Sequence, residues 1–240
     1  MTDETERALH VLKLPGMASC WTSLEETHQL DKITLRGGMQ MMVQTEQDTR
    51  RDNAVTRLIK CAHFKQKASI EELETDTPRG ISSAMVADLG TGQYLRNGMT
   101  IIITGPAGTG KSYLATPLGD RACRQNFKVM YFTMNTLVGT LKLARMENRT
   151  TNFMRKLACQ DLVIIDDWGI LKLEGDVQNE IEQIIDDRYA YKSLIIASQL
   201  PVSDWYNTFQ SELIAEACLD RLVNKSTRFN LKGDSLRKKY

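Results

Sequence analysis

Residues 105–112, which read GPAGTGKS, restrict the fold of this chain more than any other segment. They satisfy the pattern G-x-x-x-x-G-K-[ST] and stand between an aliphatic run at 99–104 and a helical pattern that continues to about residue 126. A glycine-rich turn between a strand and a helix presents backbone amides at the helix start, where the helix dipole also favours phosphate. We therefore predict a phosphate-binding loop on a parallel sheet.

Each residue type in this loop has a physical role. The three glycines permit a close backbone approach, Lys111 can reach the β- and γ-phosphates, and the hydroxyl of Ser112 can ligate Mg²⁺. Pro117 falls inside the following helix, where we expect it to cause a kink. The predicted nucleotide contacts are Gly105, Pro106, Ala107, Gly108, Thr109, Gly110, Lys111, Ser112 and Tyr113.

Strand-like and helical segments alternate through the rest of this region. Aliphatic runs at 99–104, 128–132, 162–165, 193–197 and 227–231 are separated by helical patterns, which indicates a parallel five-stranded sheet covered on both faces. Residues 2–67 show no strand pattern but three helical ones, the third from about residue 35 to 67. The predicted organisation is a helical N-terminal domain at 1–70, a linker and adenine-side segment at 71–98, and a three-layer α/β core at 99–240.

Two acids and an amide follow buried strands. Asp166 and Asp167 come directly after the run at 162–165, which carries them to the carboxyl edge of the sheet beside the phosphate loop. We expect Asp166 to hold Mg²⁺ and Asp167 to polarise the attacking water. Gln199 ends the fourth strand and can point at the γ-phosphate or the attacking water, although an ordinary polar residue at a strand end stays open as the alternative. Arg221 can serve a neighbouring subunit, although a solvated arginine at a helix end fits its sequence position equally well.

The third predicted helix carries a basic stripe. Successive steps of three and four residues place these side chains on one helical face: Arg50, Asn53, Arg57, Lys60, Phe64 and Lys67. Such a stripe suits the phosphates of DNA without sequence choice, while a simple solvated face stays open as the alternative. The predicted DNA contacts are Arg50, Arg51, Asn53, Arg57, Lys60 and Lys67.

Composition excludes several protein classes. The formal net charge is +1, no apolar run is long enough for a membrane span, and the acidic N-terminus does not follow the order of a signal peptide. The five cysteines are scattered, which is typical of reduced thiols. We expect a cytoplasmic protein without a membrane partner.

Taken together, these motifs resemble AAA+ ATPases of the helicase-loader branch, and most closely the IstB family of bacterial insertion sequences. The similarity extends over LPGM at 14–17, TPRG at 77–80, LRN at 95–97, SQLPVSDW at 198–205, the block at 217–223 and LKGDSLRK at 231–238. It implies that Lys111 and Ser112 form Walker A, that Asp166 and Asp167 form Walker B, and that Gln199 is sensor 1. It also implies that Arg221 is an arginine finger and Arg237 a sensor 2 residue, with Asp167, Lys111, Gln199, Arg221 and Arg237 taking part in catalysis.

The resemblance also has departures and consequences. Asp167 stands where typical AAA+ proteins have glutamate, and because only three residues follow Arg237, we expect the C-terminal lid to be absent or vestigial. The family implies an ATP- and Mg²⁺-dependent protein that forms a ring or helical filament on double-stranded target DNA, bends it and recruits an IstA-type transposase, with hydrolysis driving disassembly. A replicative helicase loader of the DnaC type is the alternative, while the sensor and arginine pattern disfavours a metabolic P-loop kinase.

Overall fold

The computed structural model describes residues 4–66, 69–70, 73, 80–233 and 235. The chain forms two compact units, Met1–Arg57 and Leu58–Tyr240, and each is described by itself. None of the helices in this described part is long and apolar enough to cross a membrane.

The described residues of the first unit form helices joined by turns, as expected. It contains α1 (Glu4–Val11), α2 (Pro15–Glu26) and most of α3 (Leu35–Ala62). Pro15 is the first residue of α2, a position where its missing amide hydrogen costs nothing. Gly16 lies directly against α3, because a Cβ at this position would be 2.6 Å from the Cα of Glu46. The LPGM block is therefore a site of close helix contact.

Glu46 ties these two helices together. Its carboxylate is buried and accepts hydrogen bonds from the amides of Gly16 at 2.7 Å and Met17 at 3.2 Å. The Arg50 guanidinium lies 2.7 Å away and, with these two amides, holds the pKa of Glu46 below its ordinary value of 4.5 despite burial. Gly16, Glu46 and Arg50 thus form a capping cluster at the start of α2.

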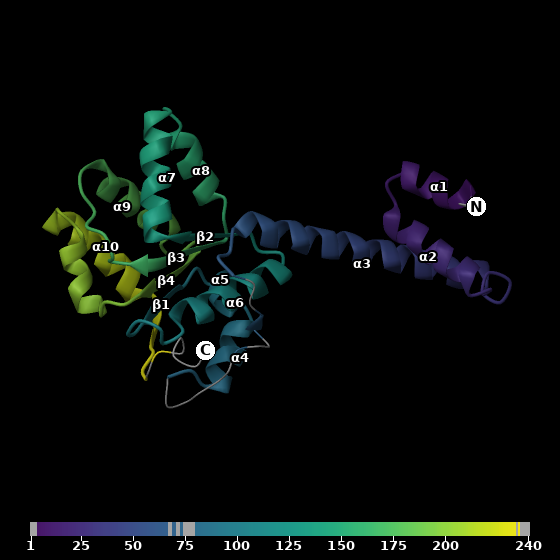
Figure 1. Cartoon of the computed structure of the whole chain (residues 1–240), viewed down its shortest axis with the longest axis horizontal. Coiled ribbons are helices and arrows are strands. Elements are labelled where there is room, and N and C mark those ends of the chain that lie inside the picture. The colour runs from purple at the N-terminus through teal and green to yellow at the C-terminus, as the bar shows by residue number, and fades with distance from the viewer. Residues whose placement is uncertain (1–3, 67–68, 71–72, 74–79, 234, 236–240) are drawn as a thin grey trace. The chain divides into compact units, whose positions relative to one another are not determined.

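The second unit contains a five-stranded parallel sheet in the order β2-β3-β4-β1-β5 (Figure 1). The strands are β1 (Thr100–Thr104), β2 (Val129–Thr133), β3 (Leu162–Trp168), β4 (Ser193–Ser198) and β5 (Ser226–Asn230). The helices of this unit are α4 (Ser83–Gly90), α5 (Gln93–Arg96), α6 (Lys111–Arg124), α7 (Met134–Met146), α8 (Thr150–Ala158), α9 (Asp176–Arg188), α10 (Glu212–Asn224) and the 3₁₀ helix η3 (Val202–Thr208).

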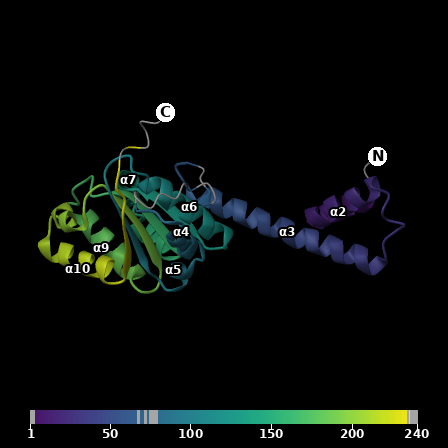
Figure 2. The same cartoon turned by 90° about the horizontal axis from the view of Figure 1, so that it is seen from below.

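Helices cover both faces of this sheet, so the predicted three-layer α/β fold is confirmed. In Figure 2, α4, α5 and α6 lie on one side of the strands, and α9 and α10 lie on the other. Alternate strand residues supply the two cores: Ile101 and Ile103 pack under α6, whereas Ile102 packs toward α7–α10. The helix α6 continues through Pro117, so this proline does not end it, and the kink remains a prediction.

Two segments differ from the sequence prediction. The long helix was expected to reach Lys67, but α3 ends at Ala62, where His63 adopts a positive φ of 58°. Phe64 then turns into the core under α6, so it is not part of the helical stripe. The second unit begins at Leu58, because Leu58, Ile59 and Ala62 from the end of α3 pack on its core.

The predicted linker at 71–98 contains two helices, α4 and α5. Leu89, Tyr94 and Leu95 from this segment are buried in the core under α6. Within this predicted linker, residues 74–79 fall outside the described residues.

Candidate nucleotide site

The phosphate loop follows β1 and leads directly into α6, as predicted. Gly105, Gly108 and Gly110 all have positive φ angles, of 150°, 80° and 99°. The loop amides thus gather at the N-terminus of a fourteen-residue helix, which favours bound phosphate. Lys111 is the first residue of α6, and its buried ammonium donates to the carbonyls of Gly105 and Pro106, both at 2.8 Å. This geometry fits the triphosphate of ATP.

The segment after β5 lies along this loop. The Leu231 amide donates to the Thr104 carbonyl at 2.7 Å, which extends the contact between β5 and β1. A Cβ at Gly105 would be 2.4 Å from the Leu231 carbonyl oxygen, and one at Gly108 would be 2.1 Å from Oγ of Ser235. Both positions therefore require glycine for two reasons: a side chain would collide with the segment after β5, and the φ angle is positive. No sequence pattern indicates this contact, because its partners are more than 120 residues apart.

Asp166 and Asp167 lie at the same edge of the sheet. They form a bulge in β3, where both oppose the single residue Ala197 of β4. Asp167 has a φ of 58°, a left-handed conformation that aspartate tolerates better than most residues. Its amide donates to Oδ1 of Asp166 at 2.8 Å. The bulge turns two consecutive acids of the strand toward different surroundings: Asp166 is fully buried and Asp167 is half-buried.

Tyr131 is a site residue that sequence reasoning missed. It lies on β2, next to β3, and its hydroxyl donates to Oδ2 of Asp166 at 2.7 Å. Burial and the nearby Asp166 carboxylate raise the pKa of Tyr131 well above its ordinary value of 10, so the phenol stays protonated and acts as the donor. An aromatic residue within an apolar strand gives no hint of a polar contact, and only the strand register places it beside Asp166.

Gln199 follows β4, which lies between β3 and β1. Thr104 at the end of β1 pairs with Ser198 at the end of β4. Gln199 therefore lies beside the start of the phosphate loop, at the end of the neighbouring strand. The side chain of Ser198 fixes this turn: its hydroxyl donates to the Trp168 carbonyl at 2.7 Å and accepts from the Leu200 amide at 3.0 Å. It also accepts from Nε1 of Trp205 at 3.2 Å, whereas the side chain of Gln199 is exposed. The SQLPVSDW block is thus held together by a serine that we had not assigned a role.

Arg221 lies away from this group of residues. It is near the end of α10. The helices α9 and α10 end just before β4 and β5 begin, so their last turns lie at the edge of the sheet where the strands start. The phosphate loop lies at the opposite edge, where the strands end. The Nε of Arg221 lies 2.7 Å from the Asp186 carboxylate, and the guanidinium also donates to the Ala217 carbonyl at 3.0 Å. The structure therefore does not bring Arg221 to the nucleotide site of its own chain. Arg237, the predicted sensor 2 residue, falls outside the described residues.

The predicted DNA contacts are only partly a surface stripe. Arg50 is exposed but is engaged with the buried Glu46 in the capping cluster, so it has a structural role that the sequence did not reveal. Lys67 falls outside the described residues, and the helix ends before reaching it. The remaining predicted contacts have exposed side chains on α3: Arg51, Asn53, Arg57 and Lys60.

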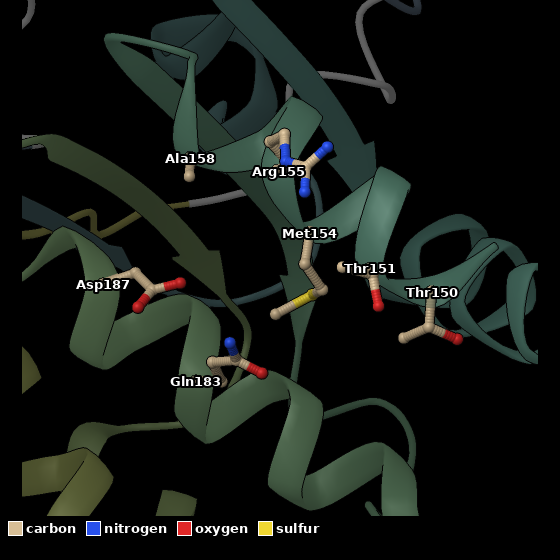
Figure 3. Close-up of a pocket in the computed structure, with 7 residues that line it drawn as sticks. All are labelled: Thr150, Thr151, Met154, Arg155, Ala158, Gln183 and Asp187. Carbon is tan, nitrogen blue, oxygen red and sulfur yellow. The ribbon is translucent and has the colours of Figure 1, made fainter.

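A cleft of about 290 Å³ lies elsewhere, between α8 and α9 (Figure 3). Met154 points from α8 toward α9 across this cleft. Its lining contains none of the predicted nucleotide contacts and consists of Thr150, Thr151, Met154, Arg155, Ala158, Gln183 and Asp187.

The family model described as IstB-like ATP binding protein matches residues 7–240, which is nearly the whole chain. The chain belongs to this family. It is 33% identical over 230 residues to the insertion sequence ATP-binding protein y4pL of Sinorhizobium fredii, covering 96% of this chain and 94% of the relative. It is also 28% identical over 236 residues to the insertion sequence IS21 ATP-binding protein of Pseudomonas aeruginosa, covering 98% and 89%.

Solved structures place this IstB-like protein in the AAA+ fold. The DnaC helicase loader aligns with a TM-score of 0.58 and 17% identity, covering 69% of this chain and 97% of that one. AMPPCP-bound DnaA from Aquifex aeolicus aligns with a TM-score of 0.60 and 19% identity, covering 72% and 52%. The expected ATP-binding AAA+ P-loop domain of the IstB type is therefore confirmed.

Proposed function

We propose that this IstB-like protein is a Mg²⁺-dependent ATPase that assembles on target duplex DNA and recruits the transposase of its insertion sequence. One observation carries the proposal. The phosphate loop, Asp166, Asp167 and Gln199 share one edge of the sheet, whereas Arg221 lies at the opposite edge. In this arrangement Arg221 can act only on the site of a neighbouring copy, so a finger role for Arg221 makes nucleotide turnover depend on assembly.

Within one chain, each residue has a separate task toward ATP. The amides of residues 108–112 and the Lys111 ammonium bind the phosphates, while Ser112 and Asp166 supply oxygen ligands that suit Mg²⁺. This small ligand set fits, because Mg²⁺ is usually held by one or two carboxylates together with phosphates and water. When bound, Mg²⁺ neutralises charge that develops on the phosphates. Asp167 orients and polarises the attacking water, and Gln199 hydrogen-bonds the γ-phosphate or that water.

Arg221 must leave Asp186 to act on a neighbouring subunit. The two side chains are 29% and 57% exposed, and an exposed ion pair contributes only about 0.2–1 kcal/mol. A phosphate with several negative charges and a bidentate geometry competes effectively with this single carboxylate. We infer that Asp186 holds the finger in an isolated chain and releases it on assembly.

Subunit mixing tests the assignment in trans. Lys111→Ala removes a phosphate contact but leaves Arg221 intact, and Arg221→Ala does the reverse. Each variant alone should lose at least about 10²-fold in turnover, because an arginine finger contributes about 10³–10⁵ in rate. An equimolar mixture on duplex DNA should recover a substantial part of the activity. If the mixture is as inactive as its components while both variants still bind DNA, Arg221 does not act between subunits.

The exposed face of α3 is the proposed DNA contact. Arg51, Arg57 and Lys60 are exposed cations on this helix, and such contacts add affinity without reading sequence. Replacing all three by alanine should weaken binding to unrelated duplexes alike and reduce the salt slope by up to about 3. The matched control replaces the same number of exposed lysines in the second unit, namely Lys128, Lys142 and Lys156. Equal losses in the two triple variants would show a general charge effect instead of a contact on α3.

Membership of the family supports the proposed assembly and partner recruitment. The curated relatives carry names of insertion sequence proteins, so we infer that the partner is the IstA-type transposase of the same element. Imaging with duplex DNA and a non-hydrolysable ATP analogue should show a ring or helical filament that bends the DNA and retains the transposase. Addition of hydrolysable ATP should disperse it. The helicase-loader alternative rests on fold likeness alone, and a preference for single-stranded over duplex DNA would favour it.

A further inference from the structure

Both oxygens of the Asp166 carboxylate are engaged by protein donors. Oδ2 accepts the Tyr131 hydroxyl at 2.7 Å, and Oδ1 accepts the Asp167 amide at 2.8 Å. A carboxylate offers about four lone pairs, so two stay available for a cation or its water ligands. Hydrogen bonds from a buried phenol to a carboxylate are short and strong, and they fix the rotation of the carboxylate plane. Of the two donors, the hydroxyl of Tyr131 is the one contributed by a side chain.

Tyr131 is itself held by Phe64. The two rings meet edge to face, with centroids 6.3 Å apart and planes at 67°. Phe64 in turn lies against Gly119 in α6, where a Cβ would be 2.6 Å from its ring. The absence of a side chain at position 119 therefore makes room for Phe64, and Phe64 limits the movement of the Tyr131 ring. These contacts all lie within the second unit.

We propose that Tyr131 is a positioning residue that orients the Asp166 carboxylate toward Mg²⁺, and that Phe64 keeps Tyr131 in place. This inference rests on the proposed role of Asp166 as a Mg²⁺ ligand. It goes beyond that role because it assigns a function to a strand residue and to the segment after α3, neither of which belongs to a nucleotide motif. The same contacts connect the end of α3 to the nucleotide site through three packed side chains.

Tyr131→Phe removes the hydroxyl and keeps the ring, and Tyr94→Phe is the matched control. Tyr94 is 7% exposed and Tyr131 is 6% exposed, and both lie in the same core. The measurement is the dissociation constant of a fluorescent ATP analogue over a Mg²⁺ titration and in EDTA. Loss of a residue that orients a metal ligand typically costs about 10–100-fold in metal affinity. We expect the Mg²⁺ midpoint to rise by about 10-fold in Tyr131→Phe and to stay unchanged in Tyr94→Phe.

Phe64→Leu gives a second, graded test, since it retains the tyrosine hydroxyl but loosens the ring. Its Mg²⁺ midpoint should lie between those of the wild type and Tyr131→Phe. An unchanged midpoint in Tyr131→Phe, with a loss of thermal stability like that of Tyr94→Phe, would overturn the inference and leave a structural hydrogen bond. An unchanged Mg²⁺ midpoint in Phe64→Leu would show that Phe64 does not keep Tyr131 in place.

Asp166→Asn separates this inference from the proposed function. If Asp166→Asn leaves the Mg²⁺ dependence unchanged, Asp166 is not a Mg²⁺ ligand, and the role that the proposed function gives this residue fails. If Asp166→Asn shifts the midpoint and Tyr131→Phe does not, only the positioning role is wrong.

Discussion

Ser198→Ala should destabilise the second unit strongly, because one buried hydroxyl links three elements. It donates to the carbonyl of Trp168 and accepts from the Leu200 amide and the Trp205 indole. Alanine leaves the Trp168 carbonyl and the Leu200 amide without this partner, while Trp205 keeps a hydrogen bond to the Leu200 carbonyl at 3.2 Å. Each buried polar group that loses its partner costs about 1–3 kcal/mol, so the expected loss is about 2–6 kcal/mol. For a unit of this size, each kcal/mol lowers Tm by about 2–4 °C.

Ser193→Ala is the matched control on the same strand. Ser193 is also fully buried, but its hydroxyl makes one hydrogen bond, to the Tyr94 carbonyl at 2.9 Å. That carbonyl also accepts from the Met99 amide at 3.0 Å, so it keeps a partner, and the loss should be only about 1 kcal/mol.

Urea unfolding followed by tryptophan fluorescence reports on this region directly. Two of the three tryptophans, Trp168 and Trp205, pack together with ring centroids 5.6 Å apart. The midpoint should fall much further for Ser198→Ala than for Ser193→Ala, at an unchanged slope. Equal shifts in the two variants would refute the reasoning that the three-way contact at Ser198 supports this edge of the sheet.

Further predictions concern both units. Gly16→Ala should destabilise the protein by about 1–3 kcal/mol in thermal melts, because its Cβ would be 2.6 Å from the Glu46 backbone. Gly139→Ala, in α7 with nothing within 4 Å of its Cβ, should instead stabilise it by about 0.5–1 kcal/mol. Because the pKa of Glu46 is lowered from 4.5, its contribution to stability is present above pH 4.5 and is lost as the pH falls through the lowered value. Melts of wild type and Glu46→Gln should therefore converge well below pH 4.5, and a constant difference would contradict this. Asp186→Ala should release Arg221 and raise ATP turnover at low protein concentration by up to about fivefold, and lower turnover would argue against a restraining role.

Local patterns predicted much of this protein correctly. The alternation of aliphatic runs with helical periods predicted the parallel five-stranded sheet, and the spacing of GPAGTGKS predicted the loop between β1 and α6. Both predictions use patterns within about 20 residues of chain, because hydrophobic periodicity and backbone preference are properties of neighbouring residues. The end of α3 was predicted less well, because the packing of Phe64 on the core decides where the helix stops.

The sequence by itself determined the fold class, the family and the chemical types of the nucleotide residues, since these depend on short-range patterns in the chain. Tertiary structure alone decided that Tyr131 contacts Asp166, that the Gly16 amide contacts Glu46 and that Ser235 lies on Gly108. It also decided that Arg221 lies at the far edge of the sheet from the phosphate loop. The physical reason is that strand register and helix packing bring together residues from 30 to more than 120 positions apart, and a hydrogen bond or a close contact depends on where the atoms meet in space.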